Sequence, residues 1–316
     1  MGELILLCQG LLVSLHRQNE SSGSEAINLT YFSTCPNDYT IYIKFKTVMK
    51  KRNLLSVMMT LLMAAFMSIS FTACSSNDDN NGGISSGTNP TTGTLVVKVN
   101  NAELIFIRVP GGTYEFTISR KDPERNAINV NLSGTMSDFY MSQTEVTNQL
   151  WKAVMGSIPQ PSEQTGDKYP VIYNSYNDIT KDGGFIDKLN ELAKDQLPAG
   201  KKIALPTEEE WHYAAKGGPR SGGYIYAGSN SIDEVAWYYD NSDASTHPVA
   251  QKEPNELGLY DMCGNVWEFT STLVDGKVAN CGGGYTSEYD WCELNLSFPD
   301  NVDELFENVG IRLVIK

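Results

Sequence analysis

The sequence predicts an irregular α+β fold that is rich in loops and has little regular secondary structure in its C-terminal half. Two observations support this prediction. Residues 95–216 contain β-branched runs and segments with apolar residues at helical spacing, which are typical of strands and amphipathic helices. Residues 219–310 are dominated by Gly, Asn, Asp, Ser and aromatic residues, which favours short strands joined by long, packed loops.

Strands are predicted before the first helix. Their β-branched or aromatic character marks residues 95–99, 104–109, 113–118 and 138–141. Pro110-Gly111-Gly112 turns the chain between the second and third of these.

Three helices are predicted. The first covers residues 145–155, with Thr144 as N-cap and Gly156 as C-cap. The second covers about 177–194, and its apolar face consists of Phe185, Ile186, Leu189 and Leu192. The third begins at Thr207, which forms a capping box with Glu210, and ends at Gly217-Gly218.

Residues 49–74 have the pattern of an export signal. A basic start at residues 49–52 is followed by an apolar run over 54–71 and then by Thr72-Ala73-Cys74, as in a secretory signal peptide. Cys74 occupies the position of the lipidated cysteine in a bacterial lipobox, although Phe71 stands where most lipoboxes have Leu. A single transmembrane helix is the alternative, since about eighteen apolar residues can just span a bilayer. The cysteine at the cleavage position favours the lipoprotein.

The remaining domain boundaries follow from that signal. Residues 1–48 are interpreted as an upstream extension before a true start at Met49, because a cleavable signal must lie at the N-terminus. The alternative keeps Met1 and treats 54–73 as a signal anchor. Residues 75–94 are polar and Gly-rich, which predicts a flexible linker. Residues 95–316 form the folded domain.

The folded part is strongly acidic. Residues 75–316 contain 18 Lys and Arg against 34 Asp and Glu, a net charge of −16. Such a surface repels nucleic acid and anionic lipid, so neither is an expected partner. After Cys74 the chain has three cysteines, Cys263, Cys281 and Cys292, so at least one thiol has no partner within the chain.

The stretch 255–270, NELGLYDMCGNVWEFT, has the residues of a cation-binding turn. Gly264-Asn265 predicts a tight turn, because Gly and Asn adopt positive φ at low cost. Asp261 and Glu268 place carboxylates on either side of that turn, and calcium prefers such oxygen-rich surroundings. The alternative is that Glu268 caps backbone amides without a metal.

Seven ordered motifs resemble the formylglycine-generating enzyme (sulfatase-modifying factor) family, whose domain is a C-type-lectin-like variant. They are residues 139–147 with Trp151, 205–215, 235–238, 246–249, 255–269, 282–285 and 309–313. The resemblance covers nearly the whole of 95–316. It implies a calcium ion held by the Asp261 and Glu268 carboxylates and the backbone carbonyls of Gly264 and Val266.

The resemblance also locates the catalytic positions. Family oxidases bind copper through two cysteines after a Gly-Gly pair, and the matching positions are Ser287 and Cys292. A hydroxyl is a hard ligand that cannot replace a thiolate on Cu(I), so Cys292 is the one catalytic residue retained and copper is not expected. Cys263 and Cys281 are interpreted as small buried hydrophobes.

Two functions fit this pattern. The favoured one is a surface or periplasmic binding module that presents residues 285–306, with Tyr285, Ser287, Tyr289 and Trp291 contacting the ligand. Its partner would be a glycan, a peptide or a cell-envelope protein, and a lipid on Cys74 would anchor it to the outer membrane or cell surface, as in Bacteroidetes lipoproteins. The alternative is an oxidase that modifies a cysteine in sulfatase-like substrates.

Overall fold

The computed structural model divides the chain into two units, residues 1–82 and 83–316. In the first unit only the backbone of four strands is described, β1 (Glu3–Cys8), β2 (Leu11–Asn19), β3 (Ser24–Thr34) and β4 (Thr40–Lys50), which pair antiparallel in sequence order. The sequence pattern does not predict these strands. The apolar run 54–71, Cys74 and the linker up to residue 92 lie outside the described residues.

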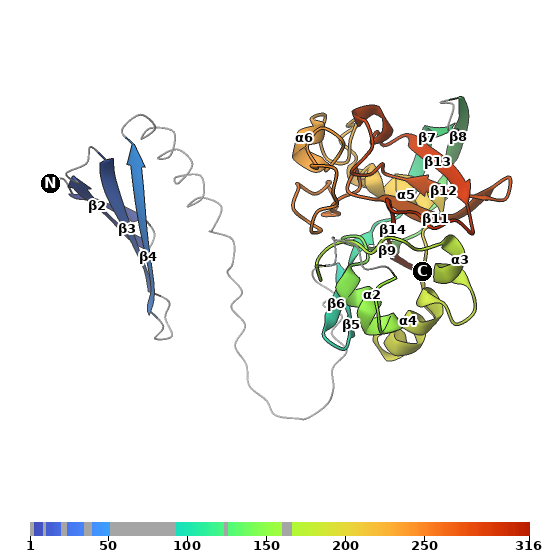
Figure 1. The fold of residues 1–316 in the computed structure, drawn as a ribbon, viewed down its shortest axis with the longest axis horizontal. Helices are drawn as coiled ribbons and strands as arrows, with labels where there is room; N and C mark the ends of the chain where they lie inside the picture. The colour runs from blue at the N-terminus through green and yellow to red at the C-terminus, as the bar shows by residue number, and fades with distance from the viewer. Residues whose placement is uncertain are drawn as a thin grey trace. The chain divides into compact units, whose positions relative to one another are not determined.

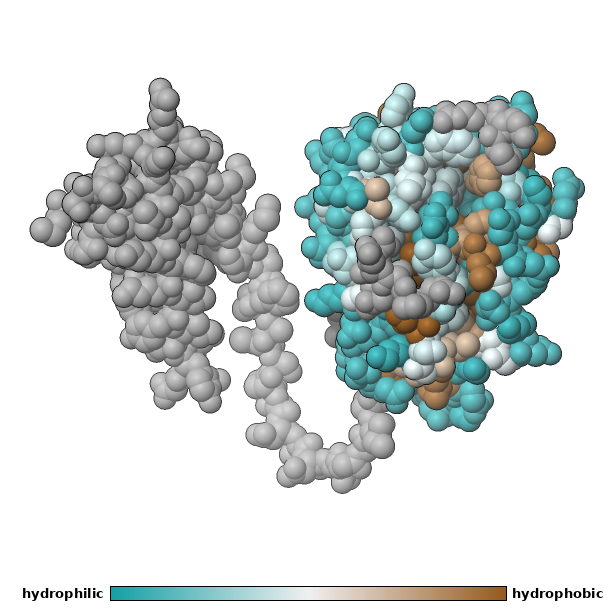
Figure 2. Space-filling model, in the orientation of Figure 1, coloured by the Kyte–Doolittle hydropathy of each residue, from teal (hydrophilic) through white to brown (hydrophobic). Residues whose placement is uncertain are grey.

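The second unit is described over residues 93–122, 126–159 and 166–316. In these parts of the chain, no helix is long and apolar enough to cross a bilayer. The face of this second unit that Figure 2 shows is mostly hydrophilic, with apolar surface gathered toward the middle. The predicted irregular α+β fold is confirmed, because two sheets and short helices are joined by long loops.

A five-stranded sheet forms one end of this domain. Its order is β10–β15–β9–β6–β5, and the bounds are Ile203–Ala204, Val314–Ile315, Phe139–Ser142, Ala102–Val109 and Thr94–Val99. Three helices lie at the same end (Figure 1), namely α2 (Asn148–Met155), α3 (Tyr176–Thr180) and α4 (Phe185–Ala193), which the short 3₁₀ helix η1 (Lys194–Gln196) follows.

A six-stranded sheet forms the other end. Its order is β14–β11–β12–β13–β7–β8, with bounds Val309–Ile311, Trp267–Val274, Lys277–Cys281, Leu296–Asn301, Gly112–Lys121 and Ala127–Met136. Helices α5 (Glu208–Ala215) and α6 (Ile232–Val235) lie at this end in Figure 1. The 3₁₀ helices η2 (Gly218–Arg220) and η3 (Tyr289–Trp291) complete the elements.

The sheets share the C-terminal segment. β14 pairs parallel with β11 in the larger sheet, and β15 pairs antiparallel with β9 and β10 in the smaller one. Arg312 and Leu313 form the link between β14 and β15, and both are fully buried. The residues that connect the sheets are therefore core residues.

The first two helices differ from their prediction. α2 begins three residues later, at N-cap Thr147 instead of Thr144, because residues 145–147 are extended: Val146 hydrogen-bonds to Ile311 and Thr147 pairs with Pro170. The predicted helix 177–194 is two helices, since Gly183 adopts a φ of 70° between them. Leu192 does not face the core and is 51% exposed.

Other local predictions are confirmed. The predicted strands appear as β5, β6, β7 and β9, while β8 was not anticipated. Gly156 ends α2 with a φ of 90°. Thr207 and Glu210 form the reciprocal capping box of α5, with the Thr207 hydroxyl accepting from the Glu210 amide at 3.1 Å.

We expect Thr207→Ala to lower the free energy of unfolding by about 1 kcal/mol, because the first turn of α5 loses its side-chain acceptor. Thr207→Ser retains the hydroxyl and should change it by less than half as much. Chemical denaturation measures both, and equal stability of the two variants would contradict this role of Thr207.

Candidate functional site

Three glycines after β12 let the following loop fold back onto the sheet. Gly282 and Gly283 have φ values of 100° and 75°, a backbone region that favours glycine. A Cβ on Gly283 would lie 2.7 Å from the Cys292 sulfur, and one on Gly284 would lie 3.2 Å from the Trp267 ring. The Gly-Gly-Gly sequence is therefore required by close packing of residues 285–292 against β11.

The turn at Gly264-Asn265 fixes the start of that loop. Both residues have positive φ, as predicted. The Asn265 carbonyl accepts from the Tyr285 amide at 2.8 Å. Its buried side chain accepts from the His247 amide at 2.9 Å and donates to Glu145 at 3.0 Å. The loop thus starts from a position held by three separate segments.

Ser287 is held inside the loop. Its hydroxyl accepts from the Gly284 amide at 2.9 Å, and its own amide donates to the Gly284 carbonyl at 2.9 Å. The Ser287 carbonyl accepts from the Tyr239 backbone amide at 2.9 Å. The Ser287 hydroxyl therefore helps to fix the conformation of the loop.

A pocket of about 360 Å³ opens beside Ser287. Its walls come from the loop after β12, from β11, from β13 and from the segment before β14. The lining residues are Trp267, Thr286, Ser287, Glu288, Trp291, Phe298, Asp300, Phe306, Asn308 and Val309. Four aromatic rings and several polar side chains meet around this space, and ligand sites combine these two kinds of side chain.

Three of the rings support one another. Trp267 and Trp291 meet edge to face with centroids 6.3 Å apart, and the Trp291 and Phe298 centroids lie 5.7 Å apart at 61°. Such pairs are favourable beyond the area they bury. The aromatic wall is therefore held in place before any ligand arrives.

Asp300 is the most perturbed acid of the pocket. Burial raises its pKa to about 6, although a hydrogen bond from Asn280 at 2.7 Å acts in the opposite direction. The charge of Glu304 raises this pKa further, and Lys277 lowers it. Asp300 thus changes its charge near pH 6.

The four predicted ligand contacts are only partly brought together. Ser287 and Trp291 line the pocket. Tyr285 is buried and anchors the loop through its backbone, and Tyr289 is 59% exposed and not part of the lining. Trp267 and Asn308 line the pocket from outside the predicted loop.

Cys292 is a buried thiol. Burial, followed by the proximity of Cys263, raises its pKa well above the usual value of a thiol. Cys263 and Cys281 are also buried and free, consistent with their interpretation as small hydrophobes. Because nucleophilic and copper-binding cysteines act as thiolates, Cys292 and the Ser287 hydroxyl do not fit a copper site.

Glu268, one of the four predicted calcium ligands, has other partners in the structure. Both oxygens of the buried Glu268 carboxylate accept from Arg312 Nε at 2.9 Å, and one also accepts from the Trp211 indole at 2.6 Å. A calcium ion bound to Glu268 would leave a buried guanidinium without its counter-charge.

Arg312 instead connects four segments. Besides Glu268 on β11, its guanidinium donates to the Ser142 carbonyl at 2.8 Å and to the Tyr260 carbonyl at 2.7 Å. Arg312 and Glu268 are both fully buried. We call Glu268 and Arg312, with these two carbonyls, the arginine brace.

Two further acids lie next to the arginine brace. Burial raises the pKa of Glu145 well above its usual value, and the charge of Asp261 adds to this. Burial also raises the pKa of Asp261, which hydrogen-bonds to Glu145. Glu145 Oε2 and Asp261 Oδ1 have no hydrogen-bond donor among the described groups, and we infer that the two carboxyls share one proton.

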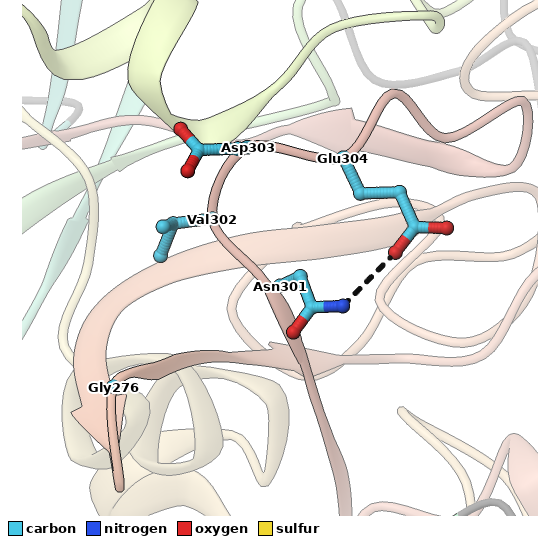
Figure 3. A pocket seen from close by; sticks show the side chains of 5 residues that line it. All are labelled: Gly276, Asn301, Val302, Asp303 and Glu304. Atoms are coloured by element: carbon cyan, nitrogen blue, oxygen red, sulfur yellow. Dashed lines mark hydrogen bonds between the residues drawn. The ribbon is translucent and has the colours of Figure 1, made fainter.

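A second depression lies at the end of β13. It is lined by Gly276 and residues 301–304, and the Asn301 amide donates to Glu304 across it at 3.2 Å (Figure 3). Its lining contains no aromatic side chain, and its polar side chains already have partners, because Asn301 donates to Glu304 and Asp303 accepts from Asn177. The pocket beside Ser287 is the better candidate.

Residues 95–316 match the sulfatase-modifying factor enzyme 1-like domain. The chain belongs to this family. It is 32% identical over 228 residues to the chaperone protein LppX of Paenibacillus barcinonensis, covering 57% of this chain and 81% of that protein. It is also 39% identical over 88 residues to a formylglycine-generating enzyme of Mycobacterium tuberculosis, covering 23% of this chain and 28% of that enzyme.

Among solved structures, the Treponema denticola variable protein 1 has the same fold, with a TM-score of 0.58 and 24% identity over 70% of this chain and 98% of that one. The sulfatase-modifying factor domain of this chain is thus matched over nearly its full length. The matched part of the M. tuberculosis enzyme is under a third of that enzyme's length.

Arg312 is the main residue that sequence reasoning missed in this sulfatase-modifying factor domain. Its signal was present, because it stands within the apolar run 309–315. A buried arginine of this kind needs a carboxylate partner, and that partner is Glu268, which the resemblance had assigned to calcium.

We expect Glu268→Gln to lower the free energy of unfolding by about 3 kcal/mol, because it leaves Arg312 buried without a counter-charge. The loss should be the same in excess calcium and with a chelator present. Thermal melts of both proteins under both conditions provide the measurement. A loss that appears only in calcium would restore Glu268 as a metal ligand.

Glu145→Gln should flatten the pH dependence of stability. The pKa of Glu145 is raised in the folded state. Its protonated carboxyl therefore contributes to the free energy of unfolding below the carboxyl pKa of the unfolded chain, and this contribution is lost as pH rises through the pKa of the folded state. Glutamine stays neutral and can donate to Asp261. Denaturation at pH 5 and pH 8 should show a smaller fall in the variant, with exposed Glu191→Gln as control, whereas parallel profiles would refute the shared proton.

Proposed function

We propose that the sulfatase-modifying factor domain is a binding module and that the aromatic pocket beside Ser287 is its recognition site. The proposal rests on one observation: four aromatic rings and three polar side chains converge around one space of about 360 Å³. The rings are Trp267, Trp291, Phe298 and Phe306, and the polar residues are Ser287, Asp300 and Asn308. Rigid rings supply contact area at low entropic cost, and polar groups between them orient a ligand.

The arginine brace supports recognition. It joins β9, β11 and the segment before β15 through charged, buried hydrogen bonds, so Trp267 at the start of β11 has a fixed position. A preformed site loses less entropy on binding than a mobile one. We propose that this ion pair does the bracing that calcium was expected to do.

Oxidation of a cysteine in a sulfatase-like peptide is the alternative that family membership suggests. It requires a pair of accessible thiolates for copper. The chain offers Ser287, whose hydroxyl is bonded to the Gly284 amide, and Cys292, whose thiol is buried and has a raised pKa. The donor set therefore favours binding over oxidation.

The cellular setting is also proposed. The signal pattern at 49–74, with Cys74 at the lipidation position, supports an exported lipoprotein held at the outer membrane or cell surface. The 32% identity to a protein named as a chaperone, LppX, is consistent with a function that binds other molecules. A surface glycan, peptide or envelope protein is the expected partner.

The test uses the full chain on glycan and peptide arrays. Trp291→Ala should abolish most binding, and Thr286→Trp should block it by filling the pocket from an exposed position without removing a buried contact. Tyr289→Ala, an exposed aromatic outside the lining, is the matched control and should bind as the wild type does. Binding that persists in both pocket variants would contradict the assignment.

A further inference from the structure

The charged residues that line the pocket beside Ser287 are all acidic, while Lys121 beside Trp291 and Lys277 near Asp300 lie outside the lining. Its charged lining residues are Glu288 and Asp300, and none of the residues that line it is basic. Residues 278–311, which supply most of the walls, contain seven Asp and Glu and no Lys, Arg or His. An anionic ligand would enter against this field, whereas a cation would be attracted by it.

The rings add to the same preference. The face of an aromatic ring is electron-rich and attracts cations, most strongly in Trp. Trp291 already has such a contact, because Lys121 Nζ lies 4.9 Å from its ring centre and 3.6 Å from Asp290. Lys121 is not a lining residue, so this contact shows how one of the rings pairs with an ammonium group and a neighbouring carboxylate.

Asp300 provides the counter-charge within the pocket. It is hydrogen-bonded by Asn280 on β12 and is less hydrated than a surface acid. Partly buried carboxylates interact with a cation more strongly than exposed ones do, because water screens them less. The size of the pocket, at the lower end of ligand sites, fits one side chain better than an extended ligand.

We propose, building on the binding function above, that this pocket binds the cationic end of an arginine or lysine side chain presented by a partner peptide, between the aromatic wall and the Asp300 carboxylate. The same chemistry would admit a free quaternary ammonium compound. A neutral or anionic sugar lacks the charge that the lining selects.

Binding should depend on pH through Asp300. The charged groups around it are Lys277 on β12, Glu304 in the turn after β13, and Glu288 across the pocket. Asp300 is ionised above its pKa of about 6 and neutral below it. A cation should therefore bind more tightly at pH 7.5 than at pH 5.

The experiment titrates the full chain with N-acetyl-arginine amide and, as an uncharged isostere, N-acetyl-citrulline amide, following the fluorescence of the pocket tryptophans. At pH 7.5 the arginine compound should bind on the order of tenfold more tightly, as expected for a partly desolvated cation–π and ion-pair contact. Choline is the third probe and represents the free ammonium source.

Asp300→Asn retains an acceptor for Asn280 and removes the charge. It should weaken binding of the arginine compound about fivefold at pH 7.5 and abolish the difference between pH 7.5 and pH 5. Glu293→Gln removes one charge of the same loop outside the lining and should behave as the wild type. Unchanged melting temperatures confirm that both variants fold.

The outcomes separate this inference from the function on which it rests. Equal affinity for arginine and citrulline compounds, with array binding still lost in Thr286→Trp, overturns the cation and leaves the binding module. Choline binding more tightly than the arginine compound overturns the side-chain source. If no probe binds and Thr286→Trp changes nothing on the arrays, the pocket is not a recognition site.

Discussion

The arginine brace is the interaction on which the rest of the domain depends. Arg312 lies between β14 and β15, the two strands that join the larger and smaller sheets. Its guanidinium satisfies the Glu268 carboxylate and two backbone carbonyls from distant segments. Forming a fully buried ion pair requires desolvation of both charges, but once the pair has formed, any arrangement that separates its partners is strongly unfavourable. A loop-rich domain with few long elements needs such a constraint.

The constraint explains how an irregular loop can form a defined pocket. β11 carries Glu268 at the brace and Trp267 at the pocket in adjacent positions. The Asn265 turn and the glycines at 282–284 then fix residues 285–292 against Trp267. Membership of the sulfatase-modifying factor family accounts for this framework. What the framework displays here is a pocket whose lining is aromatic and acidic.

Much of the fold was predictable from local pattern. The capping box at Thr207, the C-cap at Gly156 and the turn at Gly264-Asn265 depend on residues close in sequence. Other features depend on long-range pairing: Val146 bonds to Ile311, so that α2 begins later than predicted, and Glu268 pairs with a residue 44 positions away. The break at Gly183 is local, and the prediction of a single helix over 177–194 overlooked it. Trp267 and Asn308, which lie outside the predicted segment 285–306, join the pocket only through the pairing of β11 with β14, which no local pattern specifies.

We propose that this pocket recognises a ligand and does not oxidise one. This proposal is tested most directly by titrating the full chain with Cu(I) against a competing chelator and then measuring oxygen uptake with a cysteine-containing peptide, beside a copper-loaded formylglycine-generating enzyme. We expect no stoichiometric copper retention and no peptide-dependent oxygen uptake. One retained copper per chain, with oxygen uptake abolished by Cys292→Ser, would contradict the claim.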